Sequence, residues 1–322
     1  MKSKILHILL FVPILFASCN HKDILSLEGV TREIDVSFDW HNSSQAEVDG
    51  MTVYCYSLDE GGEDWRFELA GSRGGKIELP PGHYRVVAYN NDLPGVIMTR
   101  TDSYYTITAN ARQNTASTYM QTGMMYLAEI PDLTVKPCGI SYLDAEGRRT
   151  SGPDKAMVCC PDSLSTLYDV CFKNIKGLDN VVTAGFMLEG IARQMKLCDG
   201  DCQGAKADVQ SSLSVRYDNT GQGDSEDNCL VGTLTGFGIS PVNPAIYITV
   251  RVKLSDGTTV EKRIDVTWQV TQAPDRHHVI IVIDGLELPD KPLTPPDPDQ
   301  DVGMDVEVDG WTVIEIDYET QN

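Results

Sequence analysis

A chain of 322 residues, 41% hydrophobic and 23% charged, is long enough for two globular domains and too apolar to be disordered. Its formal net charge of -21 repels phosphate backbones and anionic lipid headgroups. The charge therefore argues against a nucleic-acid partner and against membrane docking through a basic face.

The amino-terminal segment has the order of a lipoprotein signal. Lys2 and Lys4 precede a short apolar run and two small residues, and Cys19 follows. We expect cleavage of a signal peptide, residues 1–18, and acylation of Cys19, because two or more acyl chains give stable membrane attachment. Residues 19–31 then form a tether. The alternatives are an ordinary secretory signal with a chance cysteine, or a transmembrane anchor, for which the apolar run is too short.

The first half of the mature chain reads as a series of strands. Apolar and polar residues alternate from Arg32 to Trp40, the pattern of a half-buried strand. A rigid turn at 80–82, Pro-Pro-Gly, separates two further strands. Weaker strand candidates follow, at 104–108, 119–127 and 133–137. The interval from 138 to 155 is rich in glycine and poor in periodic apolar residues, so it is expected to be a loop and places a domain boundary near residue 150.

The second half has the same character. Residues 186–195 are compatible with a helix, but glycines flank them and strands surround them, so we predict a strand. Asp256-Gly257 is a hairpin signal. The other expected strands are 157–161, 167–175, 212–217, 229–237, 246–254, 260–270 and 279–283. Many short strands and little helix predict an all-β protein with two tandem antiparallel β-sandwich domains, 32–150 and 151–288.

The carboxyl-terminal region differs in composition. Residues 289–303 are rich in proline and aspartate and are predicted to be an extended linker, not a calcium-binding loop. Residues 304–322 are predicted to be a β-hairpin with its turn at Asp309-Gly310. An isolated hairpin is marginal in water. It must therefore dock, either on the second domain of its own chain, which we favour, or on a neighbouring subunit.

Few residues are candidates for chemistry. Cys198 and Cys202 are close enough in sequence to form a disulfide that closes a small loop. Trp65 lies beside a glycine turn and is the candidate platform for a sugar ligand, whereas Trp40, Trp268 and Trp311 fall within strand alternation and are expected in the core. No catalytic motif, phosphate loop or metal-ligand spacing is present, so we expect no enzyme activity, no cofactor and no bound metal.

Several stretches resemble a known group of proteins. The chain is similar in four stretches to the fimbrillin-like and fimbrial-anchor lipoproteins of Bacteroidetes. These are the lipoprotein signal that ends at Cys19 (the lipobox), the strand EIDVSFDW, the turn and strand LPPGHYRVVAYNND, and the run TLTGFGISPVNPAIYITVRVKLSDGTTVEKRIDVTWQV. More narrowly, they resemble a domain family of unknown function within that group. The resemblance covers roughly residues 19–290. The separate carboxyl-terminal hairpin departs from it.

The resemblance implies a fold, a location and a function. It implies two transthyretin-like sandwiches, a lipid anchor in the outer membrane facing either the periplasm or the outside, and subunit association by strand donation. We therefore expect a non-enzymatic fimbrial accessory, anchor or adhesin subunit of the cell envelope, with fimbrial subunits as partners through strand pairing. The alternative is a glycan-binding surface lipoprotein of an outer-membrane uptake system, with Trp65 as the platform.

Overall fold

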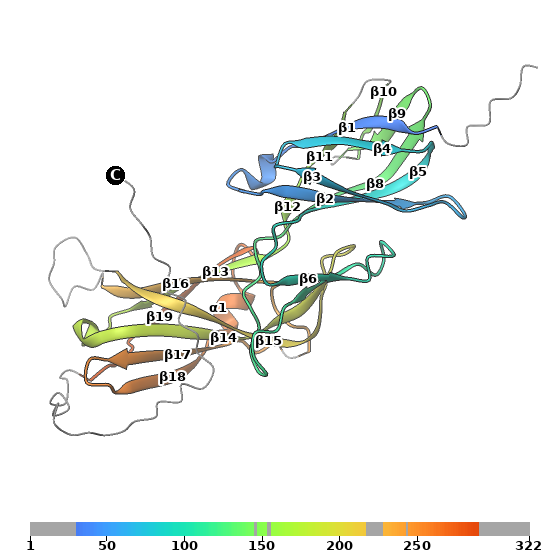
Figure 1. Cartoon of the computed structure of the whole chain (residues 1–322). Helices are drawn as coiled ribbons and strands as arrows, with labels where there is room; N and C mark the ends of the chain where they lie inside the picture. The colour runs from blue at the N-terminus through green and yellow to red at the C-terminus, as the bar shows by residue number, and fades with distance from the viewer. Residues whose placement is uncertain (1–29, 145–146, 153–155, 217–227, 243, 290–322) are drawn as a thin grey trace, which may run out of the picture.

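The computed structural model describes residues 30–144, 147–152, 156–216, 228–242 and 244–289 (Figure 1). Over these residues the chain is all-β, which confirms the predicted fold class. Its helices are short: α1 (Thr267–Thr271) and the 3-10 turns η2 (His41–Ser43) and η3 (Leu178–Asn180). The signal peptide, Cys19, most of the tether, the proline-rich linker after Pro289 and the predicted terminal hairpin lie outside the described residues.

Most of the strands that precede η3 form a first unit of two facing sheets. One sheet has the order β11-β1-β4, and the other has the order β10-β9-β8-β5-β2-β3, with β12 paired to β8. Their bounds are β1 (Arg32–Phe38), β2 (Gly50–Ser57), β3 (Trp65–Ala70), β4 (Gly74–Leu79), β5 (Gly82–Asn90), β8 (Tyr126–Lys136), β9 (Gly139–Leu143), β10 (Arg149–Gly152), β11 (Met157–Cys159) and β12 (Asp162–Ser163). Alternating apolar side chains of both sheets, among them Ile34, Met51 and Val86, meet in the first core.

A larger second unit is built on the strand order β18-β17-β14-β15-β16-β13-β19, and β6 and β7 join it through β14. The bounds are β6 (Val96–Thr99), β7 (Thr108–Ala111), β13 (Thr166–Lys173), β14 (Val181–Lys196), β15 (Cys202–Arg216), β16 (Cys229–Gly236), β17 (Tyr247–Leu254), β18 (Thr259–Asp265) and β19 (His278–Asp284). Figure 1 shows the first unit at the upper right of the view and the second at the lower left. Phe186, Leu188 and Ile248 are among the fully buried side chains of the second core.

Sheet membership does not follow chain order. β6 and β7 fall within the predicted first domain, 32–150, yet β7 pairs with β14 of the second unit. β11 and β12 fall within the predicted second domain, 151–288, yet they pair with β1 and β8. Two of the pairings, β1 with β11 and β13 with β19, are parallel, which hairpin signals in a sequence do not predict.

A third apolar cluster joins the two units. Tyr54 stacks on Tyr56 and Tyr89 of the first unit, with ring centroids 5.5 and 6.2 Å apart. These tyrosines share a buried cluster with Met195 and Phe237 of the second unit. Aromatic stacking and burial together make this contact an extension of the core instead of a polar hinge.

Two sequence predictions are wrong in detail and one is confirmed. The expected loop at 138–155 contains the hairpin β9–β10, in which Arg148 and Asp144 pair across the turn at 3.0 Å. The expected strand 260–270 ends at Asp265, where the chain turns into α1. Residues 186–195 form a strand as predicted, within β14, and Gly190 forms a bulge in it.

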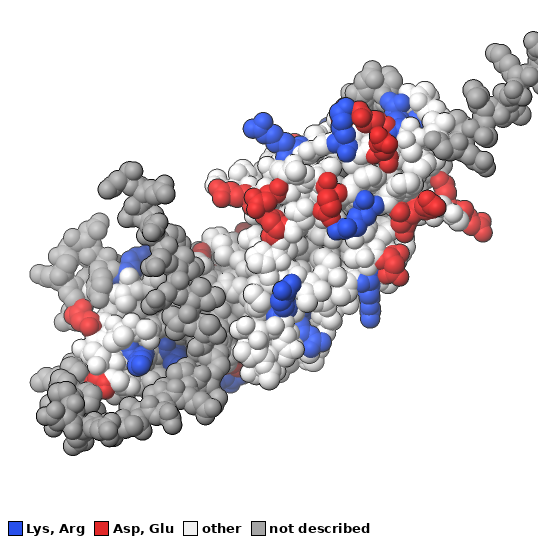
Figure 2. All heavy atoms as spheres, viewed as in Figure 1, with Lys and Arg blue, Asp and Glu red and all other residues white. Residues whose placement is uncertain are grey.

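Charged side chains of both signs are scattered over the first unit on the face that Figure 2 presents. Ion pairs within the sheets of this unit include Lys76 with Glu33 on the adjacent strands β4 and β1, and Arg149 of β10 with Asp132 of β8, across β9. On this face the net negative charge of the chain is therefore not gathered into a single acidic field.

Candidate functional site

Among the described strands, β18 and β19 are the two edge strands at the ends of the main strand order in the second unit, and they differ in character. β18 forms one edge, and consecutive exposed charges at Glu261, Lys262 and Arg263 protect it against further pairing. β19 forms the other edge and pairs only with β13 among the described strands. Its exposed side chains include Ile280 and Val282, which are 60% and 38% exposed. An apolar edge strand of this length favours strand addition.

The outward backbone groups of β19 can be assigned from its hydrogen bonds. Leu167 donates to the His277 carbonyl, and Gly285 donates to the Lys173 carbonyl. The odd-numbered residues of β19 therefore point their backbone groups toward β13, and the even-numbered residues point theirs to the open edge. At this edge no described strand pairs with Ile280. The sequence predicted the strand but contained no signal that it would be an edge.

One side chain from α1 occupies part of this edge. The Gln269 amide accepts a hydrogen bond from the Val282 N–H and donates one to the Val282 carbonyl, both at 2.9 Å. A side-chain amide thus takes the place of a neighbouring strand at one position. Trp268, next to it, is 75% exposed. The prediction that Trp268 lies in a strand core is wrong, because the helical turn points its ring into solvent.

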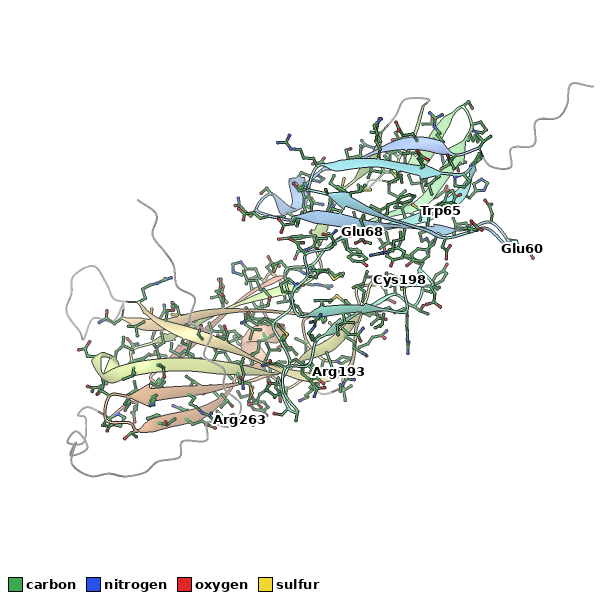
Figure 3. All side chains as sticks on the ribbon, viewed as in Figure 1. Glu60, Trp65, Glu68, Arg193, Cys198 and Arg263 are labelled. Carbon is green, nitrogen blue, oxygen red and sulfur yellow. The ribbon has the colours of Figure 1, made fainter. Side chains whose placement is uncertain are left out.

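A cavity of about 620 Å³ lies between the two units, near the first residues of β13 and β19. Its walls come from both units and include Leu127, Met195, Cys202, Arg276 and His277. Figure 3 shows Cys198 in this region between the units. Its lining mixes apolar side chains of the interface, such as Leu127 and Met195, with charged and polar residues of the adjoining loops, such as Asp199 and Arg276.

Two polar groups of the cavity, the Cys202 thiol and the Tyr168 hydroxyl, are buried and held in their neutral forms. The Cys202 thiol donates to the Phe237 carbonyl at 2.6 Å, and burial raises its pKa to about 11. A reactive thiol needs the opposite shift. The Tyr168 hydroxyl is buried without a hydrogen-bond partner among the described residues, and burial raises its pKa, so it stays neutral. Thr166, two residues away, donates to the Arg276 carbonyl instead.

The predicted disulfide between Cys198 and Cys202 is not formed in this structure, and both are free thiols. The two sulfur atoms have separate partners. Cys198 contacts the Tyr105 carbonyl at 3.9 Å and a carboxylate oxygen of Asp199 at 3.5 Å, whereas Cys202 donates to Phe237. The loop between them contains Gly200 in a left-handed conformation.

Trp65 lies at the start of β3, opposite Cys55 of β2. It is half-buried and packs against the core of the first unit. It lies away from the cavity between the units, as Figure 3 shows. A ring fixed on the core leaves only part of its face to a ligand, so the structure does not single it out as a platform. Cys19 lies outside the described residues, and no described helix is long and apolar enough to cross a membrane.

The described residues define an all-β protein of two β-sheet units, in which β19 is an edge strand. Residues 18–212 match the family described as "Domain of unknown function (DUF5119)", and the chain belongs to that family. Over 341 aligned residues it is 25% identical to a Bacteroides ovatus protein provisionally named fimbrium anchoring subunit Fim4B, covering 94% of each chain. The resemblance to Bacteroidetes fimbrial-anchor proteins that the sequence indicated is confirmed.

Solved structures share the fold at low sequence identity. A Bacteroides ovatus protein provisionally described as an adhesin has a TM-score of 0.54 and 20% identity, covering 84% of this chain and 98% of its own. A Bacteroides thetaiotaomicron protein provisionally described as polysaccharide-binding has a TM-score of 0.52 and 11% identity, with coverage of 78% and 90%. These similarities establish the architecture and extend over both units.

Proposed function

We propose that this protein is a lipid-anchored, non-enzymatic subunit of the cell envelope, of the fimbrial accessory, anchor or adhesin type. Acyl chains on Cys19 attach it to the outer membrane, and it associates with fimbrial subunits by strand pairing. The open edge of β19 is the observation that carries this proposal, because backbone groups and apolar side chains point outward there together. Family membership and the similarity to the provisionally named anchoring subunit support it.

A charge on the edge tests the pairing. Ile280→Lys places an ammonium group on the exposed face of the edge strand, beside the side chains that a donated strand would bring. It should abolish co-purification of fimbrial subunits, with little change in thermal stability, because the side chain is already 60% exposed. Val182→Lys is the matched control, since Val182 is equally exposed and lies on β14, away from this edge. Equal loss of partners in both variants, or loss in neither, would refute the role of β19.

The anchor needs its own test. Cys19→Ala removes the acylated thiol and should release the protein from washed membranes. Full retention of this variant in the membrane fraction would contradict the lipid anchor, while leaving the pairing proposal untouched.

The alternative function, glycan binding in an outer-membrane uptake system, has weaker support. It rests on Trp65, whose ring packs against the core of the first unit. A glycan array on the wild type and the Trp65→Ala variant distinguishes the two functions, because only glycan recognition through this residue predicts binding that the substitution removes.

A further inference from the structure

Two parallel strands of the first unit end side by side. β1 and β11 pair with Phe38 opposite Cys159, and the Asp39 N–H donates to the Cys159 carbonyl at 2.8 Å. Phe38 and Cys159 both point into the core. Because side chains alternate along a strand, the next residues, Asp39 and Cys160, both point away from it. A carboxylate and a thiol therefore lie next to each other on the outer face.

A short turn adds an imidazole to this pair. Trp40 fixes the turn, since its indole N–H donates to the Ser72 carbonyl at 2.7 Å and its ring meets the edge of Tyr126 at 5.5 Å between centroids. His41 then folds back on Asp39. Its backbone N–H lies 3.2 Å from one carboxylate oxygen, and its Nδ1 lies 3.2 Å from the other.

The three side chains converge on one point. One potential ligand atom from each of Asp39, His41 and Cys160 lies within 4.8 Å of the other two. In a tetrahedral zinc site, bonds of about 2.0–2.3 Å place ligand atoms about 3.3–3.7 Å apart, so movements of about 1 Å close the site. These side chains can make such movements because Asp39 and His41 are exposed. We propose that Asp39, His41 and Cys160 form a zinc-binding site.

The donor set favours zinc over calcium and magnesium. Carboxylate oxygen, imidazole nitrogen and thiolate sulfur are the ligands of zinc, whereas calcium and magnesium take six or more oxygen atoms. Three protein ligands leave the fourth position to water or to a group from another molecule. The sequence did not indicate this site, because Cys160 is distant in sequence from the other two residues and only the parallel register of β1 and β11 brings them together.

The bound ion would cross-link two segments of the first unit. It would tie the β1–η2 turn to the end of β11, and η2 contacts β12, the segment that leads into the second unit. Zinc should therefore stabilise the fold. At a hundredfold excess over the dissociation constant, we expect a rise of about 5 °C in the midpoint of thermal unfolding.

The test uses the full-length chain in detergent with its thiols reduced. Zinc affinity is measured by competition with a chromophoric chelator, and Co²⁺ is used as a spectroscopic probe of thiolate ligation. His41→Ala and Cys160→Ser should weaken zinc binding tenfold or more, since even changes outside the ligand shell cost about 10–100-fold. Cys160→Ser should also abolish the thiolate-to-cobalt absorption band.

Two controls match these variants. His83 is an exposed histidine that pairs with Asp59 at 2.8 Å, but it belongs to no three-ligand group among the described residues. Cys138 is an exposed cysteine. His83→Ala and Cys138→Ser should bind zinc as the wild type does. The proposal is overturned if Cys160→Ser or His41→Ala retains wild-type affinity, if either control loses as much, or if Co²⁺ shows no thiolate band in the wild type.

Discussion

A bulge at Gly190 divides the long strand β14 into two stretches that pair with different strands. β14 pairs with β17 as far as Glu189, and it pairs with β7 from Gln194 onward. The bulge at Gly190 separates these two stretches, with φ at +95°, in the left-handed region that disfavours a Cβ. A Cβ at this position would lie 2.4 Å from the Ala245 carbonyl oxygen, well inside contact distance.

Gly190→Ala should therefore be costly. The left-handed conformation costs an alanine about 1–2 kcal/mol, and overpacking against a fixed backbone costs about 1–3 kcal/mol more. Gly257→Ala is the matched control. Gly257 also has a positive φ, of +85°, but a Cβ there meets nothing within 4 Å. Gly257→Ala should lower the free energy of unfolding only by the conformational cost of the left-handed backbone. The entropy that alanine removes from the unfolded chain is the same in both variants and cancels in the comparison.

Equilibrium unfolding in urea measures the difference. We expect Gly190→Ala to lower the free energy of unfolding by about 1–3 kcal/mol more than Gly257→Ala does, at an unchanged slope against urea. If the two variants are equally stable, the carbonyl of Ala245 does not constrain the bulge, and the account of β14 as a strand divided by Gly190 fails.

Three further predictions concern other parts of the molecule. Burial opposes ionisation of Glu189, but hydrogen bonds from Arg263 and Thr249 outweigh it and hold its pKa below the usual range. Stability from this carboxylate is present above its unfolded pKa, near 4.5, and is lost as the pH falls through the lowered folded value; Glu189→Gln should flatten this acid limb of the unfolding curve. Trp65→Ala should lower the free energy of unfolding in urea by about 1–2 kcal/mol, because the ring is partly buried against the core. An unchanged stability would show that the ring is not part of that core. Truncation after Pro289 should lower the thermal midpoint if the tail docks on its own chain; an unchanged midpoint and monomeric state with a lost partner in pull-downs would show instead that the tail is an assembly element.

The sequence by itself determined the class of fold and most of its strands. Period-two alternation is a local property, so residues 32–40 predicted β1, and Asp256-Gly257 predicted the turn between β17 and β18, where Gly257 has the required positive φ. The same local logic predicted a strand at 186–195 against its helical composition.

Local patterns failed where a few residues had to be placed by distant partners. Trp268 continues the alternation of β18, but the chain turns at Asp265, whose carboxylate accepts a hydrogen bond from the Thr267 N–H at 2.8 Å, and α1 begins. The sequence of β9 and β10 predicted a loop because it has few periodic apolar residues. These short strands form because they pair with each other and, through β9, with β8.

Only the tertiary structure decided which strands are edges and which distant residues meet. Register between strands that are far apart in the sequence depends on the packing of whole sheets, which no local pattern encodes. The parallel pairing of β13 with β19 left Ile280 at an open edge, and that of β1 with β11 brought Cys160 beside Asp39 and His41. Both candidate sites therefore arise from parallel pairings, whose long connections hide them from sequence patterns.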